Sequence, residues 1–199
     1  MLFRSRGYLA TTNLPPASYA VHVQAESHPP SNRPVALITG ASSGIGEALA
    51  RVFAQRNYDL VLGARRIDRL TQLAQEIEQS STVRCFVQAC DVMQTDDVEA
   101  LARSARETFG RIDVVVANAG YSAQGRVDQF SEDEIRRQLE VNVMGVVRTV
   151  RATTDDLVAT KGRLAIMGSV NSFVSVARSE EHMSELQSHS DLVCRLLLE

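Results

Sequence analysis

The stretch PVALITGASSGIG (residues 34–46) joins a short apolar run to a turn rich in glycine and serine. Pro34–Thr39 has the length and composition of a buried strand. From Ile45 to about Gln55, apolar residues recur at helical spacing. The order strand, glycine turn, helix predicts a helix N-terminus with free N–H groups and a positive dipole end, which is a site for anions such as phosphate.

Each glycine of this turn has an expected task. Gly40 allows a sharp turn off the strand, and Gly44 lets the backbone approach a pyrophosphate without an intervening Cβ. Gly46 allows the helix to pack tightly on the sheet, while Ser42 and Ser43 add hydroxyl donors. A glycine turn with a purely structural role is the alternative.

Outward from the turn, short apolar runs alternate with helical segments of about 10 to 20 residues. The expected strands are 34–39, 58–63, 83–89, 112–117 and 163–167. The expected helices are 45–55, 66–79, 96–109 and a long one from Ser131, with a Ser131/Glu134 capping box, to about Asp156. Continuous apolar strands indicate a sheet covered on both faces. The fold class is therefore α/β, a doubly wound parallel sheet (Rossmann) that stops after the fifth strand.

Composition limits the classes of function. The 199 residues are 44% hydrophobic and 23% charged with a net charge of -3, which fits one globular domain and gives no sign of nucleic-acid binding. No apolar run approaches the roughly 20 residues of a membrane span. Cys85, Cys90 and Cys194 lack metal-ligand spacing, so we expect no metal and a reducing, cytoplasmic setting. Residues 1–33 lack periodicity and are interpreted as a disordered or non-native leader, with a transit peptide as the alternative.

Thr39–Gly46 fits the pattern TGxxxGxG, and with Asn118-Ala119-Gly120 after the fourth strand the chain resembles the short-chain dehydrogenase/reductase family over about residues 33–177. The resemblance implies hydride transfer between a nicotinamide cofactor and a carbonyl or alcohol substrate, by a homodimeric or homotetrameric protein. It implies cofactor contacts from Thr39, Gly40, Ser42, Ser43, Gly44, Ile45, Gly46, Asp91, Val92, Asn118, Ala119 and Gly120. Among these, Asp91-Val92 lies against the adenine and Asn118-Ala119-Gly120 borders the nicotinamide ribose.

The end of the second strand bears on the choice of cofactor. NAD enzymes of this fold usually place an acid there for the ribose hydroxyls, but here that position is Ala64. Arg65 follows directly and has the fork of donors that suits a 2′-phosphate. We therefore expect NADP rather than NAD. The alternative is that Arg65 and Arg66 form only a solvated helix start.

Two polar residues are expected to be catalytic. Asn142 has apolar neighbours in the long helix, so we expect it to be buried with hydrogen-bond partners. Ser169 ends the fifth strand, at the edge of the sheet where ligands bind. The resemblance implies that Asn142 holds a water of the proton relay and that Ser169 hydrogen-bonds the substrate carbonyl. Ser172 and Ser175 are close enough to be confused with it.

The pattern fails after Ser169. The family's Tyr-x-x-x-Lys acid/base pair should follow about 13 residues on, yet the four tyrosines and the lysine all precede Ser169, and His182 stands near the expected place. Residues 178–199 (RSEEHMSELQSHSDLVCRLLLE) resemble a translated sequencing adapter, as residues 2–5 do more briefly. We interpret 34–177 as a truncated Rossmann domain and 178–199 as an adapter-derived tail, with an amphipathic helix over 180–198 as the alternative. The fifth strand should then be an open edge with apolar surface exposed.

Three functions are compatible with these features. The first is a short-chain reductase or dehydrogenase acting on a small carbonyl or alcohol, inactive as this chain stands. The second is a non-catalytic NADP(H)-binding sensor or scaffold. The third is an α/β module that binds no dinucleotide. The substrate itself cannot be predicted, because in the resembled family it depends largely on loops beyond the serine.

Overall fold

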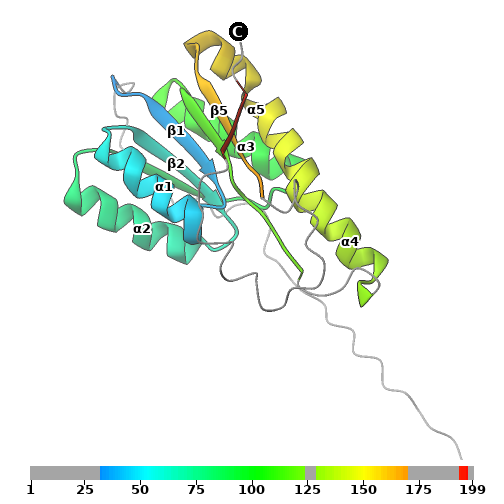
Figure 1. Cartoon of the computed structure of the whole chain (residues 1–199). Coiled ribbons are helices and arrows are strands. Elements are labelled where there is room, and N and C mark those ends of the chain that lie inside the picture. The colour runs from blue at the N-terminus through cyan, green and yellow to red at the C-terminus, as the bar shows by residue number, and fades with distance from the viewer. Residues whose placement is uncertain (1–31, 124–128, 170–192, 197–199) are drawn as a thin grey trace, which may run out of the picture.

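The computed structural model describes residues 32–123, 129–169 and 193–196, in which strands and helices alternate along the chain (Figure 1). The strands are β1 (Val35–Thr39), β2 (Asp59–Ala64), β3 (Cys85–Ala89), β4 (Val114–Ala117), β5 (Arg163–Met167) and β6 (Val193–Leu196). The helices are α1 (Gly44–Gln55), α2 (Ile67–Ser80), α3 (Thr95–Phe109), α4 (Glu132–Leu139) and α5 (Gly145–Thr160). The five predicted strands and their helices are confirmed, with boundaries shifted by one or a few residues.

The sheet has the order β3-β2-β1-β4-β5-β6, and its first five strands in the sequence run parallel. Val35 pairs with Asp59 on one side of β1, and Ala36 pairs with Val114 on the other. Strand order reverses between β1 and β4, and ligands bind at such a switch point in open α/β sheets. The predicted doubly wound parallel sheet is therefore the observed architecture.

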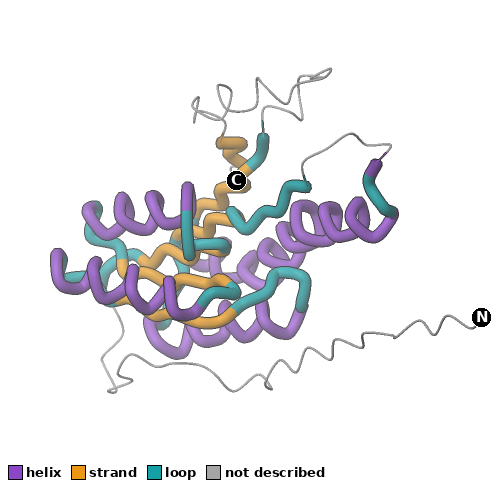
Figure 2. The backbone as a smooth tube through the Cα atoms, turned by 90° about the horizontal axis from the view of Figure 1, so that it is seen from below, coloured by secondary structure: helices purple, strands orange, loops and turns teal. Residues whose placement is uncertain are grey.

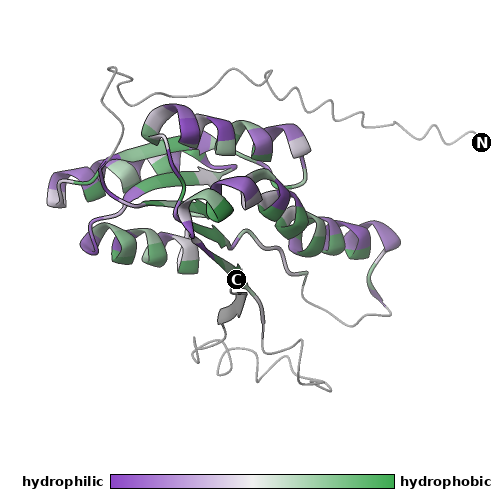
Figure 3. Cartoon of the chain, turned by 90° about the horizontal axis from the view of Figure 1, so that it is seen from above, coloured by the Kyte–Doolittle hydropathy of each residue, from purple (hydrophilic) through white to green (hydrophobic). Residues whose placement is uncertain are grey.

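Two apolar cores lie on opposite faces of the sheet, because successive strand side chains point to opposite sides. Ala36 and Ile38 of β1 pack in the core beneath α1 and α2. Val35 and Leu37 pack in the other core, with residues of α3 and α5. Figure 2 shows the strands between the two helix layers, and Figure 3 shows that the apolar residues concentrate in the strands and on the inner sides of the helices. The side chains of residues 35–38 in β1 are all buried. Burial on both faces of the sheet explains the unbroken apolar run in the sequence.

The long helix predicted from Ser131 is present but interrupted. Ser131 accepts a hydrogen bond from the Glu134 backbone N–H, and the Glu134 carboxylate accepts one from the Ser131 N–H, so the predicted capping box is confirmed. A π-helical turn, Glu140–Met144, separates α4 from α5. Large apolar side chains are exposed along this helix, at Ile135, Leu139, Val143, Met144, Val147 and Val158. Within the described part of the chain, every helix is too short or too polar to serve as a membrane span.

The outer edge of β5 differs from expectation. β6 pairs antiparallel with β5, from Leu164 opposite Leu196 to Met167 opposite Val193. The prediction of an open edge on β5 was therefore wrong, because the backbone of 193–196 takes up its hydrogen bonds. These four residues form a strand and not part of a helix. Residues 1–31, the rest of the expected tail, His182, Ser172 and Ser175 lie outside the described residues.

Candidate functional site

The glycine turn leaves β1 through a conformation that needs glycine. Gly40 has φ +68°, and its N–H and that of Ala41 donate to the Gly63 carbonyl at 2.7 and 3.3 Å. A Cβ on Gly40 would lie 2.7 Å from the Cα of Ala119. Both the dihedral angle and the close approach therefore exclude other residues here, as the sequence predicted.

Asn118 ties the end of β4 to this turn. Its Nδ2 donates to the Thr39 and Gly40 carbonyls at 3.1 and 3.2 Å, and its N–H donates to the buried Thr39 hydroxyl at 3.1 Å. A Cβ on Gly46 would lie 2.5 Å from both Asn118 Nδ2 and the Gly40 oxygen. Gly46 thus permits the tight packing that was predicted, and the group it packs against is the Asn118 amide together with the turn itself.

Helix α1 begins without a side-chain cap. Ser43 is the N-cap residue, but among the described residues its side chain makes no capping hydrogen bond. Gly44 follows with φ +61°, and a Cβ there would meet no heavy atom within 4 Å. An uncapped first turn that faces open space leaves N–H groups and the positive end of the helix dipole available to an anion.

Two arginines follow β2, and the structure distinguishes them. Arg66 donates from Nη2 to the hydroxyl oxygens of Ser42 and Ser43 at 3.0 and 2.6 Å, and its Nε lies 3.3 Å from Ser42 Oγ. Arg65 is exposed and lines the same pocket. The sequence singled out Arg65 alone, so the attachment of Arg66 to the glycine turn was missed. The signal was present, because Arg66 directly follows Arg65 where the strand ends.

The loop after β3 forms the opposite wall of the pocket. The Asp91 carboxylate accepts a hydrogen bond from the Met93 N–H at 3.1 Å, and the Asp91 N–H donates to Asp97 at 3.0 Å. Val92 is buried beside them. Burial, reinforced by the charges of Asp97 and Asp91, raises the pKa of the Cys90 thiol to about 12. Cys90 therefore stays protonated at neutral pH and is a packing residue rather than a nucleophile.

Asn142 lies in the π turn and forms hydrogen bonds with the backbone of Tyr121. Its Oδ1 accepts from the Tyr121 N–H at 2.8 Å, and its Nδ2 donates to the Tyr121 carbonyl at 2.7 Å. The expectation that Asn142 has hydrogen-bond partners is confirmed. The expectation that it is buried was wrong, because the residue is exposed. The guanidinium of Arg137 lies 4.8 Å from the centre of the Tyr121 ring, in a cation–π contact.

Ser169 is exposed and follows the end of β5 by two residues. Ala117 pairs with Ile166, so Ser169 and Gly120 each stand three residues beyond this pair, at the carboxyl edge of the sheet. Ser169 does not line the pocket, and neither do Thr39, Gly44, Gly46 and Asn142. The Thr39 hydroxyl accepts hydrogen bonds from the Asn118 and Ala119 N–H groups, which line the pocket, and Asn142 reaches the pocket through Tyr121.

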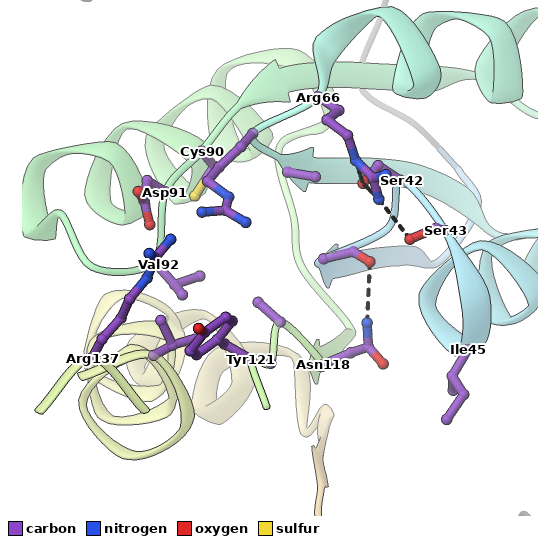
Figure 4. Close-up of a pocket in the computed structure, with 16 residues that line it drawn as sticks. Ser42, Ser43, Ile45, Arg66, Cys90, Asp91, Val92, Asn118, Tyr121 and Arg137 are labelled. Atoms are coloured by element: carbon purple, nitrogen blue, oxygen red, sulfur yellow. Dashed lines mark hydrogen bonds between the residues drawn. The ribbon is translucent and has the colours of Figure 1, made fainter. Parts of the chain in front are cut away.

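The pocket at this edge has a volume of about 330 Å³ (Figure 4). It brings together most of the residues predicted from sequence: Gly40, Ser42, Ser43, Ile45, Arg65, Asp91, Val92, Asn118, Ala119 and Gly120. Its lining also includes Ala64, which the sequence had singled out at the end of the second strand. The sequence reasoning did not assign the remaining residues to the site: Arg66, Cys90, Tyr121, Arg137 and Val141. Tyr121 could have been found because it directly follows Asn118-Ala119-Gly120.

The charges around the pocket favour an anionic ligand. Arg65, Arg66 and Arg137 line it, whereas Asp91 is the one carboxylate in the lining that the structure describes. Guanidinium groups bind phosphate and carboxylate through paired hydrogen bonds. Among the described residues, His, Cys, Asp and Glu nowhere form a group of three that could hold a metal ion. The geometry thus fits a phosphate-bearing ligand that spans from the α1 N-terminus to the loop after β3.

Comparison with known proteins shows which family the chain resembles in sequence. Residues 34–181 match the model of the family described as short chain dehydrogenase. The chain is 40% identical over 118 residues to an uncharacterized oxidoreductase of Staphylococcus saprophyticus. This aligned region covers 59% of this chain and 47% of that protein. The chain spans about half the length of the curated relatives it matches.

Solved structures share the fold. An alcohol dehydrogenase from the archaeon Thermococcus sibiricus, complexed with 5-hydroxy-NADP, is 44% identical with a TM-score of 0.68, over 69% of this chain and 58% of that one. A short chain dehydrogenase/reductase from Burkholderia phymatum, in complex with NAD, is 29% identical with a TM-score of 0.69, over 72% of this chain and 52% of that one.

Proposed function

The chain belongs to the short chain dehydrogenase family, and on that premise we propose that its pocket binds a nicotinamide dinucleotide, with NADP(H) preferred to NAD(H). The observation that carries the proposal is the uncapped start of α1 at a glycine turn, with Arg65 and Arg66 beside it and no carboxylate at Ala64. In the longer protein, the cofactor would exchange a hydride with a small carbonyl or alcohol substrate.

The residues present fit such a cofactor. A Cβ on Gly44 would meet no heavy atom within 4 Å, and the first turn of α1, which begins at Gly44, has no side-chain cap. A pyrophosphate would bind there, with the Ser42 and Ser43 hydroxyls close by. The adenine would lie against Asp91 and Val92, and the nicotinamide ribose would border Asn118-Ala119-Gly120. These assignments are part of the proposal.

Preference for NADP follows from Ala64, Arg65 and Arg66. Related proteins have been solved with an NADP derivative and with NAD, so family membership leaves the choice open. A carboxylate in place of Ala64 would repel a 2′-phosphate, whereas two guanidinium groups attract it. Arg66 is already oriented by Ser42 and Ser43, so it loses little side-chain freedom when it binds the phosphate.

The catalytic roles are proposed for the longer protein. Ser169 would hydrogen-bond the substrate carbonyl, and Asn142, with both amide atoms held by Tyr121, would contribute to a proton relay. Within the 199 residues no Tyr-x-x-x-Lys follows Ser169. We propose that residues 34–177 are the family domain and that 178–199 derive from a sequencing adapter. We also propose a homodimeric or homotetrameric cytoplasmic parent.

A second candidate is a non-catalytic NADP(H) sensor or scaffold, which needs only the nucleotide pocket and no acid/base pair. Resequencing the source gene without adapter separates the two. Continuation into Tyr-x-x-x-Lys supports the enzyme, and a stop codon near Ala177 supports the sensor.

Cofactor binding is tested by titrating the chain with NADPH and NADH, following NADPH fluorescence or heat. In Arg65→Ala and Arg66→Ala, the Kd for NADPH should rise about tenfold, equivalent to one lost charge-assisted hydrogen bond, while the Kd for NADH stays unchanged. Arg69→Ala is the control, because Arg69 lies in the first turn of α2, just after these two arginines, is exposed and does not line the pocket.

Equal effects of Arg65→Ala on the two nucleotides would contradict the preference for NADP. Absence of binding to either nucleotide by the unmodified chain would contradict the proposed function. The same chain should also show no NADPH-dependent carbonyl reduction above background. Turnover that disappears in His182→Ala would overturn that last expectation.

A further inference from the structure

Arg148 of α5 joins the segment after β3, more than 50 residues away in the sequence, to Glu140, eight residues before it. Its Nη1 donates to the Val92 carbonyl at 3.3 Å, and its Nε donates to the Thr95 hydroxyl at 3.2 Å. Its Nη2 pairs with the carboxylate of Glu140. The Arg148 side chain is 17% exposed, so this guanidinium is largely enclosed by the groups that it binds.

The π turn makes the pair between Glu140 and Arg148 possible. In a regular α-helix with 3.6 residues per turn, two residues eight apart point about 80° away from each other around the axis. The π turn Glu140–Met144 absorbs about one extra residue, which reduces this angle to about 20°. Glu140 and Arg148 therefore share one side of the helix, the side that faces the loop after β3.

Close packing also holds the start of α5 against the loop after β3. A Cβ on Gly145 would lie 2.8 Å from Cγ2 and 3.0 Å from Cβ of Val92. The start of α5 therefore lies directly against the loop that forms one wall of the pocket. With the Val92 carbonyl bound by Arg148, the helix fixes both the side chain and the backbone of this loop.

The π turn also leads to the other side of the pocket. Val141, next to Glu140, lines the pocket, and Asn142 holds both backbone polar groups of Tyr121. One guanidinium thus fastens the Asp91–Val92 loop to the turn that holds Tyr121. The two sides are also joined through the sheet and through the packing of Gly145 on Val92, but among the described contacts Arg148 adds a polar link between them.

We propose that Arg148 is a positioning residue that sets the spacing between the adenine side and the Tyr121 side of the pocket. The proposal rests on the proposed function, because it concerns a ligand that reaches both sides. A dinucleotide spans the two sides and depends on their spacing. A ligand such as 2′,5′-ADP occupies the adenine side alone and depends on it less.

The test compares Arg148→Met with Arg151→Met, a control three residues on that is exposed and outside these contacts. We measure the Kd of NADPH and of 2′,5′-ADP for the 199-residue chain at a temperature at which each variant is folded. Arg148→Met should raise the NADPH Kd about fivefold more than the 2′,5′-ADP Kd, within the usual range of coupling between sites. Arg151→Met should leave both unchanged.

Hydrogen exchange gives a second readout. The Met93 amide bonds to Asp91 and the Tyr121 amide bonds to Asn142, and Arg148 touches neither. Both amides should exchange faster in Arg148→Met. Glu140→Gln should shift the same quantities in the same direction by a smaller amount, and it serves as the test if Arg148→Met does not fold.

A role in stability alone would lower the melting temperature and leave the ratio of the two Kd values as in the unmodified chain. That result in both variants overturns this proposal while the proposed function stands. If the unmodified chain binds neither ligand, the proposed function fails and this inference fails with it.

Discussion

The two ends of the sheet differ in how far their polar groups are paired within the protein. At the amino end, the Asp59 carboxylate is 1% exposed, accepts the Arg84 N–H at 2.8 Å and pairs with Arg33 and Arg84. Asp113 binds the Val35 N–H and Arg111 in the same way. At the carboxyl end, α1 starts uncapped and the chain turns through two glycines with positive φ, Gly40 and Gly44.

This difference separates stability from binding. Polar groups at the amino end are satisfied within the protein, so they contribute to folding and have little capacity left for a ligand. The carboxyl end keeps donors and cations near Gly44 that a ligand can satisfy. Such sites are stabilised by the rest of the fold. The comparison predicts that substitutions at the two ends affect different measurements.

The largest expected effect is on stability, from Asp59→Ala at the amino end. It removes the acceptor of the Arg84 backbone N–H and the carboxylate that pairs with the partly buried guanidinium groups of Arg33 and Arg84. The free energy of unfolding should fall by about 3 kcal/mol, measured by urea denaturation, while the Kd for NADPH of the folded protein stays unchanged. Asp155→Ala, at an exposed position of α5, should change stability by less than about 0.5 kcal/mol. Weaker NADPH binding by folded Asp59→Ala would break the separation of the two ends.

A smaller effect on stability and a larger one on binding are expected at the carboxyl end. Gly46→Ala should destabilise the chain by about 2 kcal/mol, because its Cβ would lie 2.5 Å from the Gly40 oxygen. Gly44→Ala meets no atom within 4 Å but has φ +61°, so it should lose about 1 kcal/mol. Both should abolish measurable NADPH binding, since a methyl group at either position distorts or fills the turn. Normal NADPH binding by Gly44→Ala would contradict the phosphate site.

The smallest effect separates a capped helix start from an uncapped one. Ser131→Ala removes the cap of α4 and should lower stability by about 1 kcal/mol. Ser43→Ala removes no cap from α1 and should change stability by only a few tenths of a kcal/mol. Thermal or urea unfolding measures both. Equal losses in the two variants would contradict the distinction between the helix starts.

The capping box also predicts a pH dependence. Hydrogen bonds from the backbone and hydroxyl of Ser131 lower the pKa of Glu134. Because the folded pKa lies below the unfolded one, this contribution to stability is complete above the unfolded pKa and is lost as the pH falls through the folded pKa. Glu134→Gln should remove this part of the acid dependence. An acid limb identical to that of the unmodified chain would show that the contact is absent in solution.

The sequence predicted the order of strands and helices along the chain well, because there the local pattern and the tertiary packing agree. The apolar run at Val35–Thr39 is fully buried between two helix layers. The TGxxxGxG spacing produced the expected turn, because Gly40 and Gly46 leave room for close neighbours and Gly44 adopts a positive φ. Asn142 was placed wrongly because the apolar neighbours suggested a regular buried helix. The π turn changes which side of the helix faces the protein, and nothing in the letters EVNVM signals it.

The rest of the site depends on contacts between distant residues. Arg66 reaches Ser42 and Ser43, which lie 24 and 23 positions away, and Arg137 reaches Tyr121 across a loop. Sequence spacing cannot supply such pairings, since they follow from how α2 and α4 lie beside the sheet. The pairing of β6 with β5 was missed for the same reason.

Strand β1 is among the first segments of the domain to be synthesised, yet it lies in the middle of the finished sheet. It pairs with β2 soon afterwards, but its other partner, β4, begins only at Val114. At roughly 5–20 residues per second, a ribosome needs about 4 to 16 seconds to reach that point from Val35. During this interval one edge of a wholly apolar strand has no partner from its own sheet, and such edges invite aggregation. The position of β1 in the sheet therefore predicts that the time for which this edge stays unpaired during synthesis depends on the pace of translation.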